Sequence, residues 1–465
     1  REAAFRPDAA DGAPPRLFCP RKELLDVNQP EREKWLQLYQ RLWANGEPII
    51  VRGAKTGKVP WTPDCMTRAC REKNQKYGRD EAEEFMVLDC GDWTQSVMSE
   101  SEFFRGYAGK VIWPAHKSSP LMLKVKDFPA QGHFRDRLKR HYIDFLEVLP
   151  FPEYTHPEAG PMNFAAVLPP EALRPDLGPK TYIAYGREEE RGEGDNVTKL
   201  HLDLSDAVNV LSHVHISGGR SPGQPRIGAG NHIDLAASPS YGGAGAVWDI
   251  FRREDTGKLM RFLEDHKELF VGTHHEVDPK TQEITGVSQR PLTEFEMKHV
   301  IHDQWFMLQR RHLDILSRDY GVQPWHFEQY EDEAVFIPAG CAHQVRNLHS
   351  CTKVAVDFVS PESLPQCLKL RNDLRKMQKE DKLQVQLQMM CGADWAIRQL
   401  IRTGHITGEM MPEAELERIR QLSSSEGAGK AKAGGGKKRK VGAKRAAAGR
   451  RVRSAAREES DADEA

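Results

Sequence analysis

Apolar and polar positions follow two different periods along the chain, and the changes of period predict both helices and strands. Apolar residues recur every three to four positions over 33–43 and 134–149, as they do on one face of an amphipathic helix. Similar spacing predicts helices over 247–270, 302–320 and 362–377, the last continuing toward residue 402. We therefore expect several helices packed against a sheet.

Short apolar or alternating runs predict the strands of that sheet. They occupy 48–52, 84–89, 181–186, 198–216, 334–338 and 352–359. A stretch rich in Gly, Pro and Ser follows at 217–245 and is typical of a long surface insertion. Beyond about residue 422 almost no apolar residue remains, so this tail cannot bury enough surface to fold.

Composition narrows the class of protein without selecting a function. A chain of 465 residues can hold one large domain with an accessory layer. No apolar run approaches the roughly 20 residues that span a bilayer, so we expect no membrane insertion. The formal net charge of -1 carries no argument about partners, and eight scattered cysteines without a CxxC pair indicate reduced thiols in a nuclear or cytosolic setting.

Three His-x-Asp motifs offer candidate metal ligands. A ferrous oxygenase uses two histidines and one carboxylate on one face of the iron. A His-x-Asp on a strand supplies two of them, because residues i and i+2 project to the same side. The motifs are His201-Asp203, His232-Asp234 and His312-Asp314.

Context separates the three motifs. His232 lies in the Gly/Pro/Ser-rich insertion, and His312 lies in a helical pattern where i and i+2 point apart. Only His201 lies in a strand pattern, TKLHLDL, with apolar residues alternating around it. The third ligand should follow a distant strand and turn, and VFIPAGCAH offers His343. From spacing alone, ordinary core or surface histidines at 201 and 343 remain an equal alternative.

Longer segments are more specific than any two-ligand motif. The strings ALRPDLGPKTYIAYG, TKLHLDLSDAVNVL and AVFIPAGCAHQVRNLHSCTKVAVDFVSPES closely resemble the jumonji-C (JmjC) domain of histone demethylases that act on mono- and dimethylated lysine 9 of histone H3. The similarity covers roughly 43–385 in the same order. It implies an α+β protein with a double-stranded β-helix (a cupin-like jelly roll), flanking helices, and Fe(II), 2-oxoglutarate and O2 as cofactor and cosubstrates.

The resemblance also implies a division of the chain. We expect an N-terminal helix and strand region over 1–130 that packs on the core. The JmjC jelly-roll catalytic domain should cover 131–385, with an insertion at about 217–246. A C-terminal helical region should follow over 386–421, and a disordered basic tail with an acidic end over 422–465.

Carried over from the family, the metal ligands fall on His201, Asp203 and His343. Thr198 and Asn209 match positions that line the 2-oxoglutarate pocket. The alternatives are a β-branched strand former at Thr198 and a local side-chain to backbone hydrogen bond at Asn209.

The cation that should bind the distal carboxylate of 2-oxoglutarate departs from the family pattern. Many JmjC enzymes place a lysine where this chain has Gly218. Lys353, on the strand after His343, is the candidate replacement, and Arg220 in the insertion is a weaker one. The alternative for Lys353 is an edge-strand lysine that faces water.

Two tyrosines and several charged runs bear on the substrate. Tyr182 and Tyr185 occupy the place where related enzymes line the methyl-lysine entrance, although either could instead pack in the core. The acidic runs 188–190 and 328–333 are available to a basic histone tail, or are simply solvated. The basic run 437–441 predicts nuclear import and possible contact with nucleic-acid phosphates, unless it only solubilises the tail.

The function expected from the resemblance is a nuclear Fe(II)/2-oxoglutarate-dependent histone lysine demethylase that regulates transcription. It should hydroxylate N-methyl groups on lysine 9 of histone H3 and release formaldehyde. Two alternatives stay open. The same iron site would serve a JmjC protein hydroxylase, and the glycine at 218 leaves room for a catalytically weak chromatin scaffold.

Overall fold

The computed structural model describes most of the chain between residues 17 and 419. The described residues are 17–54, 58–76 (backbone only from 70), 84–110, 121–125, 128, 133–169, 171–172, 175–187, 198–216, 243–280, 284–377, 383–407, 410 and 412–419. The chain divides into two compact units, Arg1–Gln388 and Met389–Ala465. The sheets described below belong to the first unit.

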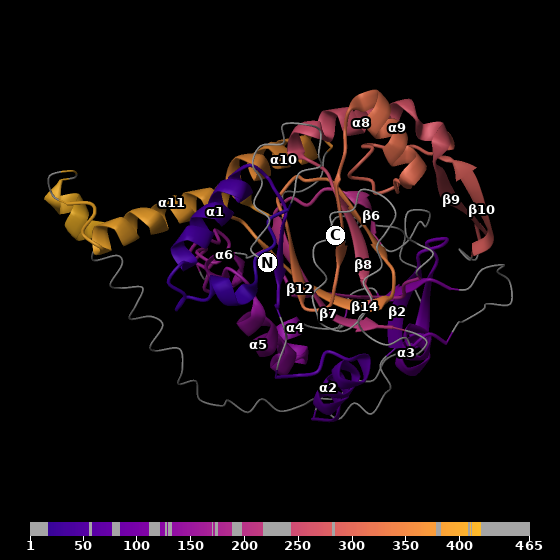
Figure 1. The fold of residues 1–465 in the computed structure, drawn as a ribbon, viewed down its shortest axis with the longest axis horizontal. Coiled ribbons are helices and arrows are strands. Elements are labelled where there is room, and N and C mark those ends of the chain that lie inside the picture. Colours follow the sequence, from indigo (N-terminus) through magenta and orange to yellow (C-terminus); the bar gives the residue numbers. More distant parts are fainter. Residues whose placement is uncertain are drawn as a thin grey trace. The chain divides into compact units, whose positions relative to one another are not determined.

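Two antiparallel sheets form the centre of the first unit (Figure 1). The larger has eight strands in the order β1 (Ile49–Arg52), β12 (Glu333–Ile337), β7 (Asp206–His215), β14 (Ser350–Phe358), β5 (Lys180–Ala184), β4 (Leu123–Val125), β2 (Glu84–Asp89) and β3 (Gln95–Ser99). The smaller has four, in the order β11 (Trp325–Gln329), β8 (Ala246–Ile250), β13 (His343–Asn347) and β6 (Thr198–His201).

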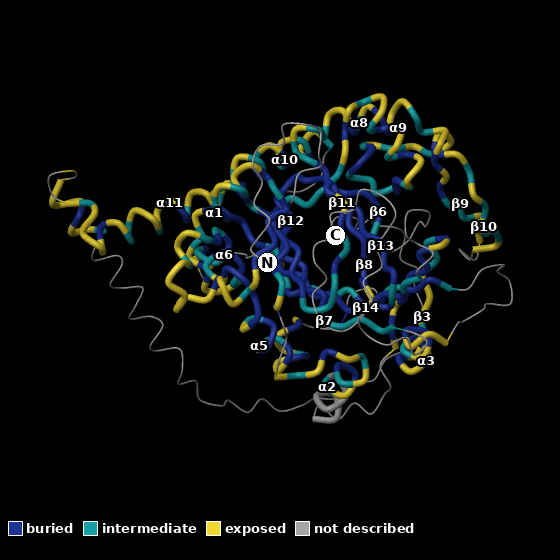
Figure 2. The backbone as a smooth tube through the Cα atoms, in the orientation of Figure 1, coloured by how far each residue is buried: buried dark blue, intermediate teal, exposed yellow. Residues whose placement is uncertain are grey.

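The inner faces of the two sheets share one hydrophobic cluster. Val335 from the eight-stranded sheet and Trp248 and Val345 from the four-stranded sheet are all buried in it. Figure 2 shows these strands as the buried centre of the unit. Strands distant in sequence are neighbours in both sheets, as in β7 beside β12 and β14. The arrangement confirms the predicted α+β fold with a jelly-roll core.

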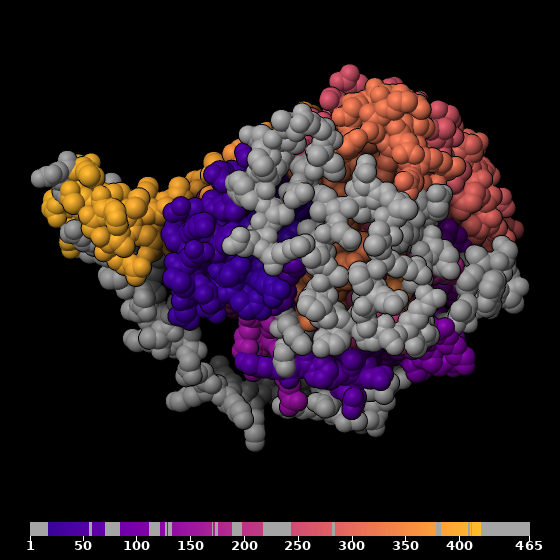
Figure 3. All heavy atoms as spheres, in the orientation of Figure 1, coloured from indigo at the N-terminus to yellow at the C-terminus, as the bar shows by residue number. Residues whose placement is uncertain are grey.

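Helices cover the outer faces of the sheets. In β7, Val208 and Val210 belong to a second cluster with aromatic residues of the N-terminal helices, including Trp43, because alternate strand residues point to opposite faces. The N-terminal helices are α1 (Arg32–Ala44), α2 (Pro63–Lys76), α3 (Glu100–Tyr107), α4 (Phe134–Arg137), α5 (Lys139–Val148) and α6 (Pro152–Thr155). On the other side, α8 (Thr256–Asp265) and α9 (Arg310–Tyr320) pack together and bury Leu200 of β6. The atoms of this part of the chain form the orange region at the upper right of Figure 3.

The remaining elements are a hairpin and short or C-terminal helices. They are β9 (Val271–Val277), β10 (Ile284–Pro291), α10 (Leu364–Lys376), α11 (Val385–Arg402), and the 3-10 helices η1 (Lys22–Leu25), η2 (Arg253–Asp255), η3 (Lys267–Leu269) and η4 (Leu292–Glu294). Helices were predicted in the α10 and α11 regions, and the structure has them there. The predicted tail over 422–465 lies outside the described residues, as does 217–242 of the predicted insertion.

Two predicted helices were wrong in part. The predicted helix over 247–270 begins with strand β8, and only Thr256–Asp265 is α-helical after it. All five residues of β8 are buried, and four of them are apolar, so the strand shows no alternation of apolar and polar residues. The predicted helix over 302–320 begins only at Arg310, because the preceding segment runs beside β6, where Leu200 donates its backbone N–H to Phe306 O at 2.8 Å.

The eight-stranded sheet continues across the predicted boundary at residue 130. β1 pairs with β12, and β4 pairs with β5, so N-terminal strands extend the jelly-roll sheet on both sides. None of the described helices has the length and hydropathy needed to cross a membrane.

Candidate metal centre and its pocket

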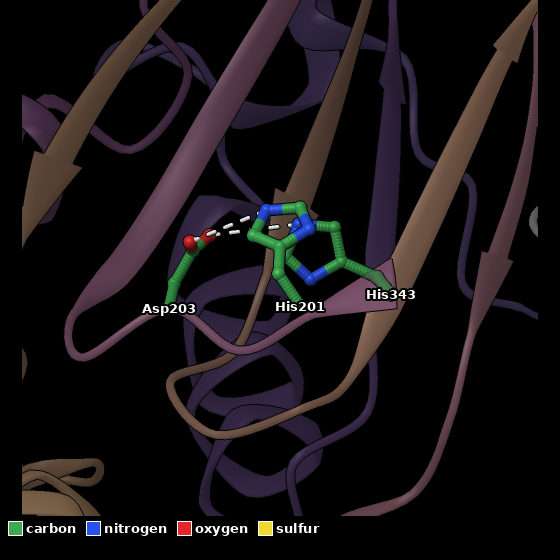
Figure 4. A group of neighbouring side chains, drawn as sticks. All are labelled: His201, Asp203 and His343. Carbon is green, nitrogen blue, oxygen red and sulfur yellow. Dashed lines mark ion pairs between the residues drawn. The ribbon is translucent and has the colours of Figure 1, made fainter. Parts of the chain in front are cut away.

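His201, Asp203 and His343 lie together between the two sheets (Figure 4). His201 ends β6, Asp203 lies in the turn that leads to β7, and His343 begins β13, directly opposite His201 in the strand register. One ligand atom from each residue lies within 4.8 Å of the others. Within the described part of the chain, this is the group of histidine and acidic residues with the geometry to hold a metal ion.

Backbone carbonyls fix the tautomer of both histidines. Nδ1 of His201 lies 2.8 Å from Lys199 O, and Nδ1 of His343 lies 3.0 Å from Cys341 O. A carbonyl oxygen only accepts, so each Nδ1 carries the hydrogen and donates it. The lone pair therefore sits on Nε2 of each ring, which is the arrangement seen in metal-ligating histidines.

Electrostatics favours the ligating forms of both rings. Burial lowers the pKa of His201 and of His343 to about 4, so both imidazoles are neutral near pH 7. Burial also raises the pKa of Asp203, and the charges of His201 and Lys180 partly oppose that rise. A dication at this point would supply the positive charge that the buried carboxylate lacks.

The distances between the donor atoms match those between ligands of one metal ion and are too long for hydrogen bonds. His201 Nε2 is buried and has no hydrogen-bond partner among the described residues. It lies 3.6 Å from Asp203 Oδ1, and His343 Nε2 lies 3.6 Å from Asp203 Oδ2, both too long for a hydrogen bond. Two atoms bound at about 2.1 Å to one ion lie roughly 3–3.6 Å apart. Two imidazoles and one carboxylate therefore fit a ferrous ion.

The other His-x-Asp motifs do not form such a group in the described residues. His312 lies in α9, where its Nδ1 accepts from the backbone N–H of Gln309 at the start of the helix. His232 lies outside the described residues.

A buried aspartate near the ligands organises the two turns that carry them. Asp206, which follows the Asp203 turn, accepts the backbone N–H of Ala339 at 2.8 Å and that of Ser360 at 3.1 Å. Ala339 belongs to the turn before His343, whose Gly340 N–H donates to Asp203 O at 3.0 Å. These bonds tie the ligand-bearing turns to each other and to the end of β14.

An irregularity in the pairing of β6 with β13 places Thr198 on the inward face of the four-stranded sheet. His343 pairs with His201 and Val345 pairs with Thr198, so between these pairs one residue of β13 opposes two of β6. Val345 faces the inner cluster, and directly paired residues share a face. Thr198 therefore faces inward although it lies an odd number of residues from His201.

The inward face of the eight-stranded sheet, opposite these residues, carries a buried lysine. Lys353 lies on β14, a central strand between β5 and β7, and is 5% exposed. Its Nζ donates to Asn347 Oδ1 at 2.7 Å and lies 5.7 Å from the ring centroid of Trp248, which stacks on His343. Burial lowers the pKa of Lys353, and it makes no ion pair with the described residues. The alternative of an edge-strand lysine facing water is wrong.

Asn209 of β7 lies on the same inward face as Lys353, beside the next inward residue of β14. It pairs with Ala355 of β14, and Lys353 pairs with Leu211 two residues further along β7, so all four residues are on the inward face. Asn209 Oδ1 is buried and has no hydrogen-bond partner among the described residues. A buried amide oxygen without a partner on this inward face is a candidate to receive a hydrogen bond from a ligand.

Tyr182 of β5 and Tyr185, which follows it, point to opposite faces of the eight-stranded sheet. Tyr182 pairs with Lys353 and shares the inward face. Tyr185 is buried in the outer cluster, where its ring packs 5.0 Å from that of Phe103 and its hydroxyl donates to Phe103 O at 2.6 Å. Tyr185 therefore packs in the core, as in the alternative given above, and does not line a substrate entrance on the inward face.

Two charged residues beside the triad were not singled out from the sequence. Lys180 Nζ lies 3.3 Å from Asp357 Oδ2, and both side chains are partly exposed. Burial raises the pKa of Asp357 to about 6, against the charge of Lys180, and the charge of Asp203 adds to the rise. The alternation of Lys353, Ala355 and Asp357 along KVAVDF would have placed Asp357 on the inward face.

Several predicted residues lie outside the described residues, namely Gly218, Arg220, the acidic run 188–190 and the basic run 437–441.

Comparisons with known proteins agree with this geometry. Residues 228–358 match the family model described as "JmjC domain, hydroxylase", a range that includes His343 and begins after His201 and Asp203. The chain is 39% identical to lysine-specific demethylase JMJ29 and 35% identical to JMJ27, both of Arabidopsis thaliana, over 83% and 86% of its length. It is 32% identical to human lysine-specific demethylase 3A over 80% of its length.

The chain spans only part of these relatives, covering 45% of JMJ29, 57% of JMJ27 and 27% of human lysine-specific demethylase 3A. Because each of these alignments covers at least 80% of the chain, each necessarily includes the central residues His201, Asp203 and His343. The jelly roll, the ligand group and these matches together show that the chain contains a JmjC domain.

Proposed function

We propose that this protein is an Fe(II)- and 2-oxoglutarate-dependent lysine demethylase that removes mono- and dimethyl marks from lysine 9 of histone H3. The observation that carries the proposal is the buried group of His201, Asp203 and His343, with both Nε2 lone pairs and the carboxylate converging on one point. The names of the relatives support lysine demethylation, and the resemblance of the long sequence segments supports the histone position.

The three ligands leave part of the coordination sphere of an iron free, as the 2-His-1-carboxylate arrangement does. Bound ferrous iron, with 2-oxoglutarate and dioxygen, supplies the oxidation that hydroxylates an N-methyl carbon, after which formaldehyde is lost. The protein contributes the position and the neutral state of the two imidazoles. It also excludes water, since both histidines are almost fully buried.

The residues proposed for 2-oxoglutarate lie on both inner walls. Lys353 binds the distal carboxylate, because it is a buried cation without an anionic partner among the described residues. Asn209 and Thr198 line the same pocket from β7 and β6. Tyr182 is the neighbour of Lys353 on β5, so we place it at this end of the pocket rather than at the substrate entrance. The lysine expected at position 218 is then not required.

The chromatin setting is part of the same proposal. The substrate is the basic tail of histone H3, and the protein acts in the nucleus to regulate transcription. The basic run 437–441 supports nuclear import by its composition, and its contact with nucleic-acid phosphates would strengthen binding to chromatin.

A peptide panel tests the proposal. The protein is incubated with Fe(II), ascorbate, 2-oxoglutarate and histone H3 peptides methylated at lysine 4, 9, 27 or 36, and the masses are followed. We expect loss of methyl groups from the lysine 9 peptides, formaldehyde in equal amount, and no loss with His201→Ala. His312→Ala, which alters a histidine of a second His-x-Asp motif, is the matched control and should retain turnover.

The same panel separates the alternatives. A gain of one oxygen on another protein, with no loss from any histone peptide, would replace demethylase by protein hydroxylase. Absence of 2-oxoglutarate consumption by iron-loaded protein with every substrate would support a scaffold without turnover.

A further inference from the structure

The inner face of the eight-stranded sheet carries opposite charges at its two ends. Lys353, Ala355 and Asp357 alternate along β14 and share the inward face. At about 3.3 Å per residue, Lys353 and Asp357 are roughly 13 Å apart along the strand. The small side chain of Ala355 lies between them. One wall of the pocket therefore has a cation at one end and a carboxylate at the other.

The two ends differ in exposure as well as in charge. Lys353 is 5% exposed and lies against Trp248 and Asn347 in the interior. The side chain of Asp357 is 21% exposed and therefore reaches solvent. An anionic cosubstrate held at the interior end leaves the open end for the second reactant. That reactant is a methylated amine, which is cationic near pH 7.

Asp357 lies beside the metal ligands on this open end. Its carboxylate contacts Lys180, and the charge of Lys180 also acts on Asp203. In the strand register Asp357 pairs with Ala207, which follows the Asp203 turn on β7. A group bound to Asp357 is thus held near the point where the three ligand side chains converge.

The Asp357 carboxylate retains hydrogen-bonding capacity for a ligand. Among the described residues, Lys180 is its one partner, through Oδ2. An ionised carboxylate offers about four acceptor positions on its two oxygens, so Oδ1 can accept from a further donor. The ion pair with Lys180 orients the carboxylate and favours its charged form against the effect of burial.

We infer that Asp357 accepts a hydrogen bond from the protonated methylated amine of the substrate and thereby makes the site prefer amines that keep an N–H. This specificity role rests on the proposed demethylase function. Monomethyl- and dimethylammonium groups carry at least one N–H, and a trimethylammonium group carries none. A charge-assisted hydrogen bond contributes about 1.5–3 kcal/mol, which is roughly a tenfold or larger preference.

Binding measured without turnover tests this role directly. The protein is loaded with Ni(II) in place of iron and with 2-oxoglutarate, and histone H3 peptides with mono-, di- or trimethylated lysine 9 are titrated by fluorescence anisotropy. For the wild-type protein we expect Kd values at least about tenfold lower for the mono- and dimethyl peptides than for the trimethyl peptide. Asp357→Ala should remove this preference by weakening the first two most.

Matched variants separate recognition from folding. Asp136→Asn removes a charge from an exposed residue of α4 and should leave the preference intact. Asp357→Asn keeps an acceptor oxygen without the charge and should give an intermediate preference. Thermal unfolding and the affinity for 2-oxoglutarate, measured on each variant, show whether the pocket is preserved.

Two results would overturn the inference in distinguishable ways. Equal weakening of all three peptides by Asp357→Ala, or an unchanged preference, would assign Asp357 a structural role while leaving the demethylase proposal in place. Absence of formaldehyde from iron-loaded wild-type protein with every methylated histone peptide would remove the proposed function, and the specificity role with it.

Discussion

The backbone amide of Gly340 donates a hydrogen bond to the backbone carbonyl of Asp203, with an N···O distance of 3.0 Å. One residue carries a metal-ligand side chain, and the other lies in the turn that precedes His343. The contact joins segments more than a hundred residues apart in sequence at the point where their ligands meet. It makes the geometry of the ligand group depend on the conformation of the Gly340 turn.

Gly340→Ala should weaken metal binding. Gly340 has a φ of +77°, and an added Cβ would clash with the side-chain nitrogen of Gln366. The left-handed conformation costs an alanine roughly 1–2 kcal/mol. Relief of that strain would shift the turn and the hydrogen bond to Asp203. We expect about tenfold weaker affinity for divalent metal, as for other changes that disturb ligand orientation, measured by titration calorimetry.

Gly321→Ala is the control for this prediction. Gly321 ends α9 with a φ of +64°, and an added Cβ would meet nothing within 4 Å. It should lower the free energy of unfolding by a similar amount without changing the metal affinity. Equal metal affinities in both variants would show that the Gly340 turn does not position the ligands.

Lys353→Met should raise the KM for 2-oxoglutarate at least about tenfold, because a charge-assisted hydrogen bond to the distal carboxylate is lost. Without cosubstrate, the variant should be as stable as the wild-type protein or more stable. Burial lowers the pKa of Lys353, so the folded protein binds fewer protons there than the unfolded chain, and wild-type stability rises with pH toward 10.5. The variant should lack this rise in chemical denaturation experiments.

An unchanged KM with Lys353→Met would assign the distal carboxylate to another cation. Stabilisation by 2-oxoglutarate gives an independent reading, since the ligand should raise the Tm of the wild-type protein much more than that of the variant.

A buried ion pair joins β13, the strand that carries His343, to the neighbouring strand β8. Arg346 Nη1 lies 3.0 Å from Asp249 Oδ2, and His326 Nδ1 lies 2.6 Å from Asp249 Oδ1. Burial alone would raise the pKa of Asp249, but the hydrogen bond and charge of His326 and the charge of Arg346 lower it overall. Burial lowers the pKa of His326, and its bond to Asp249 more than reverses that effect.

His326→Gln should therefore destabilise the protein in a pH-dependent way. The contribution of the charged histidine is complete below its unfolded pKa of 6.5 and is lost as the pH rises through the higher folded value. We expect a loss of about 1 kcal/mol at pH 6, limited by solvent screening of the partly exposed ring, and little difference at pH 9. Urea denaturation at the two pH values measures it; equal losses at both would contradict the assigned charge state.

Tyr185→Phe should leave the KM for methylated peptide unchanged. The hydroxyl bonds to Phe103 O on the outer side of the sheet, away from the triad. Its removal should cost about 0.5–1.5 kcal/mol of unfolding free energy. A clear rise in the peptide KM with unchanged stability would instead return Tyr185 to the substrate entrance.

The sequence pattern alone predicts the strand that carries His201, but it does not predict which neighbouring residues face inward beside the metal ligands. The strand around His201 was visible because its apolar residues alternate. Period-two reasoning alone would also have separated Tyr182 from Tyr185, which lie three residues apart in one predicted strand. Thr198 needed the structure, because the irregular pairing of β6 with β13 reverses the face that simple alternation assigns to it.

Strand β8 shows the limit of pattern in the fold itself. Its residues AVWDI are buried on both faces and lead directly into a helical region, so no alternation marks the change. Asp249, in the middle of this run, would look out of place in a buried strand. Its partners Arg346 and His326 come from two other strands, and only the assembled sheet shows how its charge is satisfied.

Anaerobic titration with ferrous iron in the presence of 2-oxoglutarate tests the central claim most directly. The account predicts one iron bound per wild-type chain, with a visible charge-transfer band from chelated 2-oxoglutarate. Binding should be lost in His201→Ala, Asp203→Ala and His343→Ala and retained in His312→Ala, each folded by circular dichroism. Full iron binding and an unchanged band in any of the three triad variants would contradict the assignment of these residues as the metal centre.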